Sequence, residues 1–318
     1  MSTAVTPRSA APAGAVRLAE VGRTFPTKDG ARTVLRGVDV ALSPGEIVAV
    51  VGPSGCGKST LLRLIGGLDR ATAGSITVDE ASVQAHDEST AIAFQEPRLL
   101  PWRTIAQNVA LGLPRGTKKA AARARVAELL ELVGLTHAAE QRPREVSGGM
   151  AQRASLARAL ARSPRVLLLD EPFGALDALT RLKMHDLLLE IHRAQPTTIV
   201  LVTHDVEEAL YLADRVLLLR NLHATQPERP RAKVVALGSG SGIGALGSAG
   251  PHGSGPEHPA HAPDRTGSVA RVVTVPGARP RDRAARAITD LRTSLLDGLG
   301  VHHHTTLTST PLTTKETA

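Results

Sequence analysis

The feature that most constrains this 318-residue chain is a glycine-rich turn that directly follows a short apolar segment. Residues 47–51 read Ile-Val-Ala-Val-Val, and residues 52–60 read Gly-Pro-Ser-Gly-Cys-Gly-Lys-Ser-Thr. The apolar run predicts a strand buried on both faces, as in a parallel sheet. A helix is expected from Lys58 to Ile65. The turn between them fits the spacing G-x-x-x-x-G-K-[ST] of a loop that encloses phosphate groups.

Each residue type in this turn has a physical reason. Glycines let backbone N–H groups face phosphate oxygens, and the positive end of the following helix faces the same anion. Lys58 would neutralise the β- and γ-phosphates, and Ser59 would offer its hydroxyl to Mg²⁺. Cys56 stands at a variable position, where we interpret it as a space-filler and not a redox switch. The predicted phosphate-binding residues are Gly52, Pro53, Ser54, Gly55, Cys56, Gly57, Lys58, Ser59 and Thr60.

Two carboxylates follow a second apolar segment, residues 166–169. At the end of a buried strand, Asp170 could reach Mg²⁺ through water, and Glu171 could polarise an attacking water molecule. Acidic residues are also common in turns after strands, so the pair alone is a moderate signal. The phosphate loop in the same domain favours the catalytic interpretation.

Apolar strands alternate with helical patterns along most of the chain, which predicts a doubly wound α/β sheet. Further strands are expected at residues 199–203 and 216–219. Helices are expected at residues 120–133, from the N-cap Ser147 to about Arg162, and at residues 207–213.

The chain divides into five predicted parts. Residues 1–14 are expected to be a disordered lead, and residues 15–221 the nucleotide-binding domain. A low-complexity insertion follows at 222–268, and its stretch 238–267 is rich in Gly, Ser, Pro and His. A strand near 269–275 and an amphipathic helix at 282–299 occupy residues 269–301, before a disordered tail at 302–318.

Composition argues against several functions. The formal net charge is +8, but no aromatic residue follows Tyr211, so the basic tail has no rings on which bases could stack, and we expect no nucleic-acid partner. The single cysteine excludes an intrachain disulfide. No apolar run reaches the roughly 20 residues of a membrane span, and none at the start resembles a signal peptide. We therefore expect a soluble, cytoplasmic protein.

Residues 146–153 read Val-Ser-Gly-Gly-Met-Ala-Gln-Arg, which resembles the signature of the ABC ATPases. The resemblance implies a P-loop NTPase fold with a RecA-like core, an antiparallel β subdomain and a helical subdomain at about 96–160. It also implies a head-to-tail homodimer in which Ser147, Gly148 and Gly149 clasp the γ-phosphate of an ATP held by the partner. Met150 departs from the usual glutamine, which should not affect contacts made by the serine and glycines.

Other positions match the family in the expected order. The resemblance implies that Gln95 contacts Mg²⁺ and the attacking water, and that the loop ending at Asp177 crosses the dimer interface. It implies that His204 contacts the γ-phosphate. The alternative is a structural histidine at the end of a strand, with its hydrogen bonds made within the protein. By its place upstream of the phosphate loop, Phe25 could stack on adenine, and a core phenylalanine is an equally good interpretation.

The segment Gln-Glu-Pro-Arg-Leu-Leu-Pro-Trp at 95–102 and the Met-Ala-Gln variant at 150–152 resemble ATPases of sulfonate, taurine and nitrate importers. The Arg-Pro-Arg-Asp-Arg segment at 279–283 favours aliphatic sulfonates. The resemblance implies two permease subunits, an extracytoplasmic solute-binding protein, and a peripheral location at the cytoplasmic face of the plasma membrane. Trp102 could belong to a permease-docking patch or be buried in the helical subdomain.

Three other functions are alternatives to an importer ATPase, and each predicts a different sequence feature. A soluble ABC ATPase outside transport would be favoured by a long coiled-coil insertion or tandem cassettes, and the sequence has neither. A P-loop kinase would lack the signature. A regulatory module without hydrolysis would lack Glu171 or His204. A metal site at His302–His304 is less favoured than a solvated tail.

Overall fold

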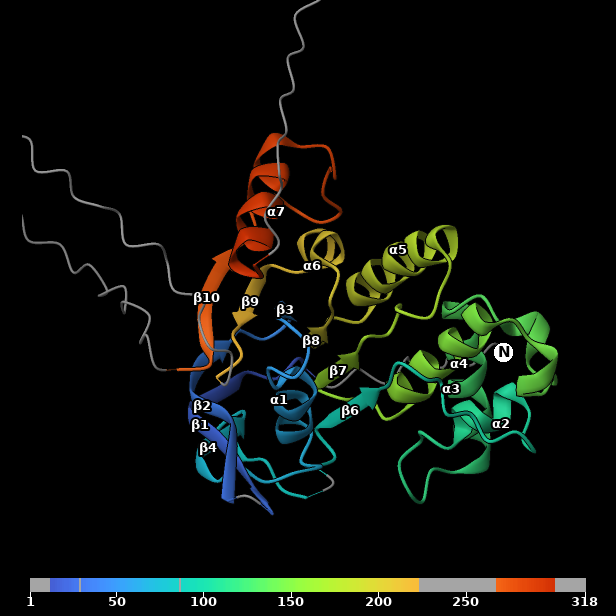
Figure 1. Cartoon of the computed structure of the whole chain (residues 1–318). Helices are drawn as coiled ribbons and strands as arrows, with labels where there is room; N and C mark the ends of the chain where they lie inside the picture. Colours follow the sequence, from blue (N-terminus) through green and yellow to red (C-terminus); the bar gives the residue numbers. More distant parts are fainter. Residues whose placement is uncertain (1–11, 29, 86, 223–266, 301–318) are drawn as a thin grey trace, which may run out of the picture.

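The computed structural model describes residues 12–28, 30–85, 87–222 and 267–300, which form two sheets and a helical subdomain (Figure 1). The larger sheet has the strand order β10-β9-β3-β8-β7-β6. Strands β9, β3, β8, β7 and β6 run parallel, and β10 pairs antiparallel with β9 at one edge. The strand bounds are β3 Ile47–Val51, β6 Thr90–Ala93, β7 Val166–Asp170, β8 Thr198–Val202, β9 Arg215–Leu219 and β10 Val269–Thr274.

The central strand β3 shows why this sheet is covered on both faces. Ile47, Ala49 and Val51 belong to one buried apolar cluster, and Val48 and Val50 belong to the other. Successive side chains of a strand point to opposite faces, so a wholly apolar strand needs cover on both. One face is covered by α1 (Lys58–Ile65) with the smaller sheet, and the other by α5 (Ala178–Ala194) and α6 (Val206–Leu212) (Figure 1).

The smaller sheet is antiparallel and has the order β2-β1-β4-β5. Near its end β2 alternates buried Val38 and Val40 with exposed Asp39 and Ala41, as expected for a sheet that faces a core on one side and water on the other. The strand bounds are β1 Val16–Thr27, β2 Gly30–Leu42, β4 Ala73–Val78 and β5 Ala81–Ser82.

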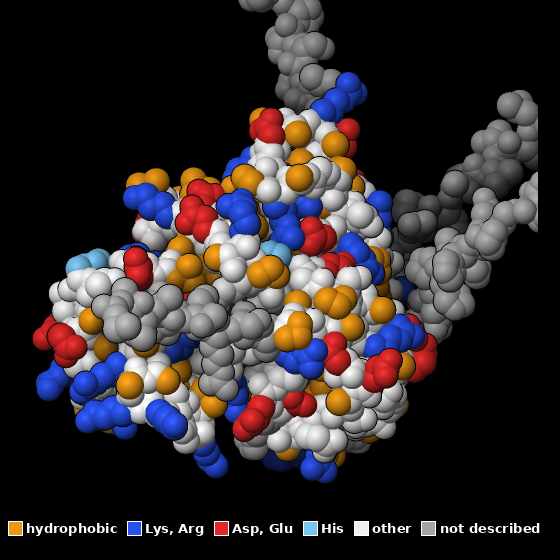
Figure 2. Space-filling view, turned by 180° about the vertical axis from the view of Figure 1, so that it is seen from behind, with side chains coloured by type: hydrophobic (Ala, Val, Ile, Leu, Met, Phe, Trp, Pro, Cys, Tyr) orange, Lys and Arg blue, Asp and Glu red, His pale blue; other side chains and the backbone are white. Residues whose placement is uncertain are grey.

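The helical subdomain lies between β6 and β7 in sequence and beside β6 in space (Figure 1). Its core includes Ile105, Leu129 and Leu160. Seen from behind, cationic side chains gather along the lower part of the subdomain, whereas both charge signs are interspersed over the rest of that face (Figure 2). The element bounds are α2 Ile105–Ala110, α3 Lys119–Leu132, the 3₁₀ turns Thr136–Ala138 and Pro143–Glu145, and α4 Gly148–Ala161.

The C-terminal part attaches to both sheets, through β10 at the edge of the larger one and through Ser268, which bonds to β2 of the smaller one. Ser268 is fully buried, donates its N–H to the carbonyl of Arg36, and accepts the Arg36 N–H on Oγ, both at 2.8 Å. Helix α7 (Arg286–Gly298) packs against α6, where it buries Ile288 and Leu295 (Figure 1).

Most of the expected elements are confirmed, and two expectations need correction. The helix expected to begin at Asp282 begins at Arg286, because the Asp282 carboxylate accepts the N–H of Ala284 and forms a turn first. Gly14 does not belong to a disordered lead, since it is buried and its carbonyl accepts the hydroxyl of Thr198 at 2.6 Å. The expectations for residues 1–11, 223–266 and 301–318 lie outside the described residues.

In the described parts of the chain, no helix combines the length and hydropathy that a bilayer crossing requires.

Candidate active site

The predicted phosphate loop connects β3 to α1 and is shaped by its glycines. Gly57 has φ +103° at the N-cap of α1, and a Cβ there would lie 2.7 Å from Cδ2 of Leu35. A Cβ on Gly52 would lie 2.7 Å from Sγ of Cys56 and from the carbonyl oxygen of Leu219. Both positions therefore require glycine. Lys58 Nζ lies inside the loop, donating to the carbonyl of Gly52 at 2.8 Å and of Pro53 at 3.2 Å.

Cys56 is buried under this loop. Burial raises the pKa of its thiol, and the charge of Lys58 only partly opposes that shift. A thiol with a raised pKa is a poor nucleophile, so the geometry favours the space-filling interpretation.

Two oxygen ligands suited to a magnesium ion lie side by side at the carboxyl ends of the strands. Ser59 Oγ donates to Asp170 Oδ1 at 3.0 Å, across 111 residues of sequence. Partial burial raises the pKa of Asp170, the hydrogen bond from Ser59 opposes the shift, and the charge of Glu171 adds to it. A hydroxyl and a carboxylate oxygen in contact fit the hard-oxygen chemistry of Mg²⁺.

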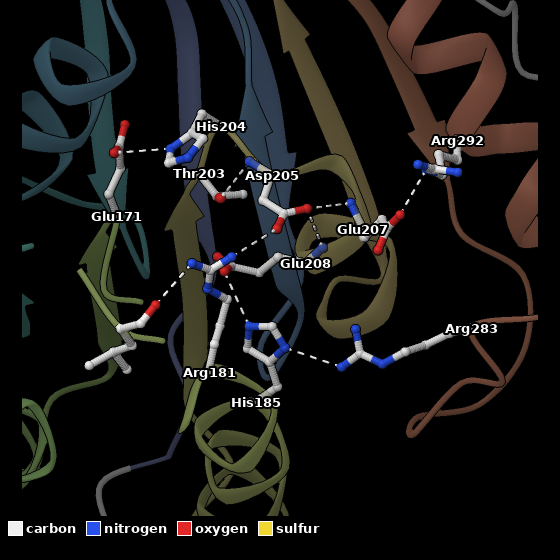
Figure 3. Close-up of polar contacts among 11 residues, drawn as sticks. Glu171, Arg181, His185, Thr203, His204, Asp205, Glu207, Glu208, Arg283 and Arg292 are labelled. Atoms are coloured by element: carbon white, nitrogen blue, oxygen red, sulfur yellow. Dashed lines mark hydrogen bonds and ion pairs between the residues drawn. The ribbon is translucent and has the colours of Figure 1, made fainter. Parts of the chain in front are cut away.

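Glu171, the residue after Asp170, contacts His204. Glu171 has φ +45°, and its N–H donates to the carbonyl of Val202 at 2.9 Å. Its Oε2 lies 3.2 Å from Nδ1 of His204 (Figure 3). A Cβ on Gly174 would lie 3.4 Å from Nε2 of Gln95 and 3.7 Å from Cε1 of His204. Tertiary structure thus brings together residues 95, 171, 174 and 204, of which the first and last are 109 positions apart in the sequence.

The signature residues lie on a different surface. Ser147 is the N-cap of α4, and its side chain accepts the N–H of Met150 at 3.3 Å. Ser147 and Gly148 are exposed, and a Cβ built on Gly148 would meet no described atom within 4 Å outside its own turn of helix. Ser147 and Gly149 border an open hollow of about 660 Å³, whose lining also includes Arg153, Thr180 and Lys183 but none of residues 52–60.

Asp177 is the N-cap of α5, where it accepts the N–H of Thr180 at 3.0 Å. This backbone hydrogen bond lowers the pKa of the Asp177 carboxyl. Arg181 lies one helical turn after Asp177, and no sequence motif singles it out. Its guanidinium donates to the carbonyl of Leu176 at 3.0 Å and lies 3.7 Å from the carboxylate of Asp205, so it joins two loops of the site. The local sequence does not predict this role, because the two contacts of Arg181 form only in the tertiary structure.

Phe25 lies near the end of β1, half-buried, with the Arg23 guanidinium 4.2 Å from its ring centroid. It belongs to neither buried apolar cluster, which disfavours the core interpretation.

Trp102 is 69% exposed, which rules out the alternative that it is buried in the helical subdomain and leaves the alternative of an exposed patch. The loop that carries Trp102 is held by the buried Asn108, whose side-chain amide accepts the N–H of Leu100 and donates to the carbonyl of Leu100. The tryptophan lines a surface hollow with Pro101, Arg142, Arg144 and Glu145.

Comparison with known proteins agrees with this geometry. The sequence pattern of the ABC transporter family matches residues 35–174. The aliphatic sulfonates import ATP-binding protein SsuB 1 of Xanthomonas axonopodis pv. citri is 51% identical over 211 residues, covering 64% of this chain and 84% of that protein. The Bacillus subtilis aliphatic sulfonates import ATP-binding protein SsuB is 46% identical over 206 residues, covering 65% and 80%.

The chain belongs to the ABC transporter ATP-binding proteins. Among solved structures, the dimeric post-hydrolysis ATP-binding cassette MJ0796 bound to ADP and Pi matches with a TM-score of 0.58 and 33% identity, over 65% of this chain and 96% of that one. The fold is that of the ABC ATPases, with a parallel core sheet and an antiparallel β subdomain, as the sequence predicted. The protein is therefore an ATP-hydrolysing ABC ATPase of a class whose cassettes bind nucleotide and form dimers.

Proposed function

We propose that this ABC ATPase energises the import of aliphatic sulfonates. The observation that supports the substrate class is 46–51% identity to proteins named for aliphatic sulfonate import, over most of their lengths. The same role in a taurine, nitrate or other small-anion importer is the second candidate, because the ATPase itself does not bind the solute. A non-transport ABC ATPase is a third and weaker candidate.

In this proposal the phosphate loop holds ATP, and Lys58 leaves the carbonyls of Gly52 and Pro53 to contact the β- and γ-phosphates. Ser59 Oγ and Asp170, with Gln95, would hold Mg²⁺, which supplies charge neutralisation on the phosphate oxygens when bound. Ser59 and Asp170 already lie in contact, so little rearrangement is needed.

Glu171 is the proposed base that polarises the attacking water. Its carboxylate contacts Nδ1 of His204, so both side chains would lie next to the terminal phosphate. His204 Nε2 would remain available to contact that phosphate. Ser147, Gly148 and Gly149 would act on the nucleotide of a partner copy, because the hollow beside their helix N-terminus includes no residue of their own phosphate loop. Asp177 would lie at that interface, and Phe25 would stack on adenine.

The proposed assembly contains two copies of this chain, two membrane permease subunits and an extracytoplasmic solute-binding protein, at the cytoplasmic face of the plasma membrane. The exposed Trp102, with the charged residues around its hollow, offers an amphipathic surface for a permease helix.

The test is to reconstitute the chain with its permease and binding protein in liposomes and to measure ATP turnover with ethanesulfonate, taurine and nitrate. Sulfonate-specific stimulation is expected, and a complex carrying Glu171→Gln should show none. Stimulation by nitrate alone would reject the sulfonate assignment. Turnover that never responds to permease or solute would reject a role in transport.

A further inference from the structure

A buried polar pair joins α5 to α6 and lies outside the proposed nucleotide contacts. His185 of α5 and Glu208 of α6 are 2% and 3% exposed, and Nε2 lies 3.2 Å from Oε2 (Figure 3). Phe173 packs edge-on against the imidazole at a centroid distance of 5.0 Å. Burying polar groups costs free energy unless their hydrogen bonds are made, so this pair depends strongly on its partners.

The C-terminal segment before α7 determines how the pair is bonded. Arg283 Nη2 lies 3.2 Å from Nδ1 of His185, and its guanidinium covers the ring of Tyr211 at 3.7 Å. A guanidinium only donates hydrogen bonds, so Nδ1 must accept and carry no proton. The ring proton is then on Nε2, from which it is donated to Glu208. Arg283 therefore selects the tautomer that can bond Glu208.

Glu208 in turn lies in the first turn of α6, which is bonded to the loop at residues 203–205 that carries His204. The backbone N–H groups of Glu207 and Glu208 donate to Asp205 Oδ1 at 2.8 and 3.2 Å, and the N–H of Asp205 donates to Thr203 Oγ1 at 2.9 Å. The side chain of His204, between Thr203 and Asp205, is 66% exposed. Its position therefore depends on the backbone of residues 203–205 more than on side-chain packing.

His185, the α5 member of the pair, is connected through its helix to the loop before α5. His185 lies one helical turn after Arg181, which donates to the carbonyl of Leu176 and contacts Asp205 (Figure 3). Glu208 Oε1 has no hydrogen-bond partner among the described residues, so the bond from His185 is the side-chain contact that compensates the burial of this carboxyl group. Weakening the bond between His185 and Glu208 would loosen the packing of α5 against α6. The loops that precede these helices, at residues 174–177 and 203–205, would then be held less firmly.

We propose that Arg283 is a positioning residue for ATP hydrolysis. By holding His185 in the tautomer that bonds Glu208, it fixes α5 against α6 and thereby places His204 and the loop at residues 174–177. The C-terminal segment thus supports turnover without touching nucleotide. This inference rests on the proposed roles of Glu171 and His204.

The test measures kcat, KM, ATP affinity and melting temperature in full-length variants at a temperature where all are folded. Arg283→Ala and His185→Leu should each lower kcat about tenfold and leave ATP affinity within about twofold, since the phosphate loop is untouched. His185→Gln should retain most activity, because a glutamine amide can donate to Glu208 and accept from Arg283. Arg292→Ala is the matched control: it removes an exposed ion pair with Glu207 on the same α6–α7 interface and should leave kcat unchanged.

Equal kcat values for His185→Leu and His185→Gln would overturn the proposal, as would an equal loss in Arg292→Ala. A kcat for Arg283→Ala equal to that of the wild type would also overturn it. If the wild type turns over ATP and Glu171→Gln does not, these failures concern positioning alone. If Glu171→Gln turns over normally, the proposed hydrolytic function itself fails.

Discussion

The phosphate loop and the signature helix are both helix N-termini that can bind phosphate, but they are built differently. The phosphate loop is closely packed against its own chain. A Cβ added to Gly52 or Gly57 would collide with neighbouring atoms, and Ser59 forms a hydrogen bond with Asp170 of the distant strand β7. The signature turn is bonded within its own helix, through Ser147 and Met150, and its outer face is open. In the proposed site, the phosphate-loop half is built within a single chain, and the signature half is completed by the surface of a second copy. This difference predicts that changes in the two regions will separate ATP binding from dimer formation.

The largest effect is expected from Glu171→Gln, which keeps the shape of the phosphate-loop half and removes its base. Loss of a general base typically costs 10²–10⁴-fold, so turnover should fall about a thousandfold while ATP binding persists. Size-exclusion chromatography with ATP should then show an accumulated dimer. Glu88→Gln, at an exposed residue, is the control. Unchanged steady-state hydrolysis would contradict the assignment of the base.

Lys58→Ala should weaken binding to the phosphate-loop half itself. Removing a charge-assisted contact to phosphate should lower ATP affinity by about a hundredfold, which nucleotide titration would measure. Lys28→Ala removes the same charge from the exposed end of the β1–β2 hairpin and should have no effect. An unaltered affinity in the Lys58 variant would show that this loop is not the nucleotide site.

Ser147→Arg tests the open half, because a bulky cation there should block the approach of a second copy. ATP affinity of the monomer should stay within about twofold, and turnover should fall about tenfold as the dimer is lost. Ser82→Arg makes the same change on the exposed strand β5. A variant that still forms an ATP-dependent dimer would remove the distinction between the two halves.

The smallest effect is expected from deleting residues 238–267, which belong to neither half. Strands β9 and β10 pair antiparallel, and the N–H of Arg220 donates to the carbonyl of Ser268 at 3.0 Å, so the ends of the intervening segment already lie close together. Loop-closure cost changes slowly with length, and ATPase activity should stay within about twofold. A large drop in melting temperature would show that the segment is structural.

Sequence alone determined the elements whose signals are local. The strand–glycine turn–helix unit at residues 47–65, the N-cap Ser147 and the two acidic residues after β7 follow from periodicity, glycine spacing and capping chemistry, which act over a few residues. The resemblance to ABC ATPases added Gln95 and His204, which carry little local signal.

Only the tertiary structure decided which of these residues meet, and which side chains support them. The contact of Ser59 with Asp170 joins residues 111 positions apart, and the bond from His185 to Glu208 joins two helices through a buried pair with no sequence pattern. Trp102 is exposed on a loop whose backbone is bonded to a buried asparagine, which hydrophobicity alone would not predict. Periodicity records the face that a residue presents, whereas contacts between distant segments depend on how whole elements pack.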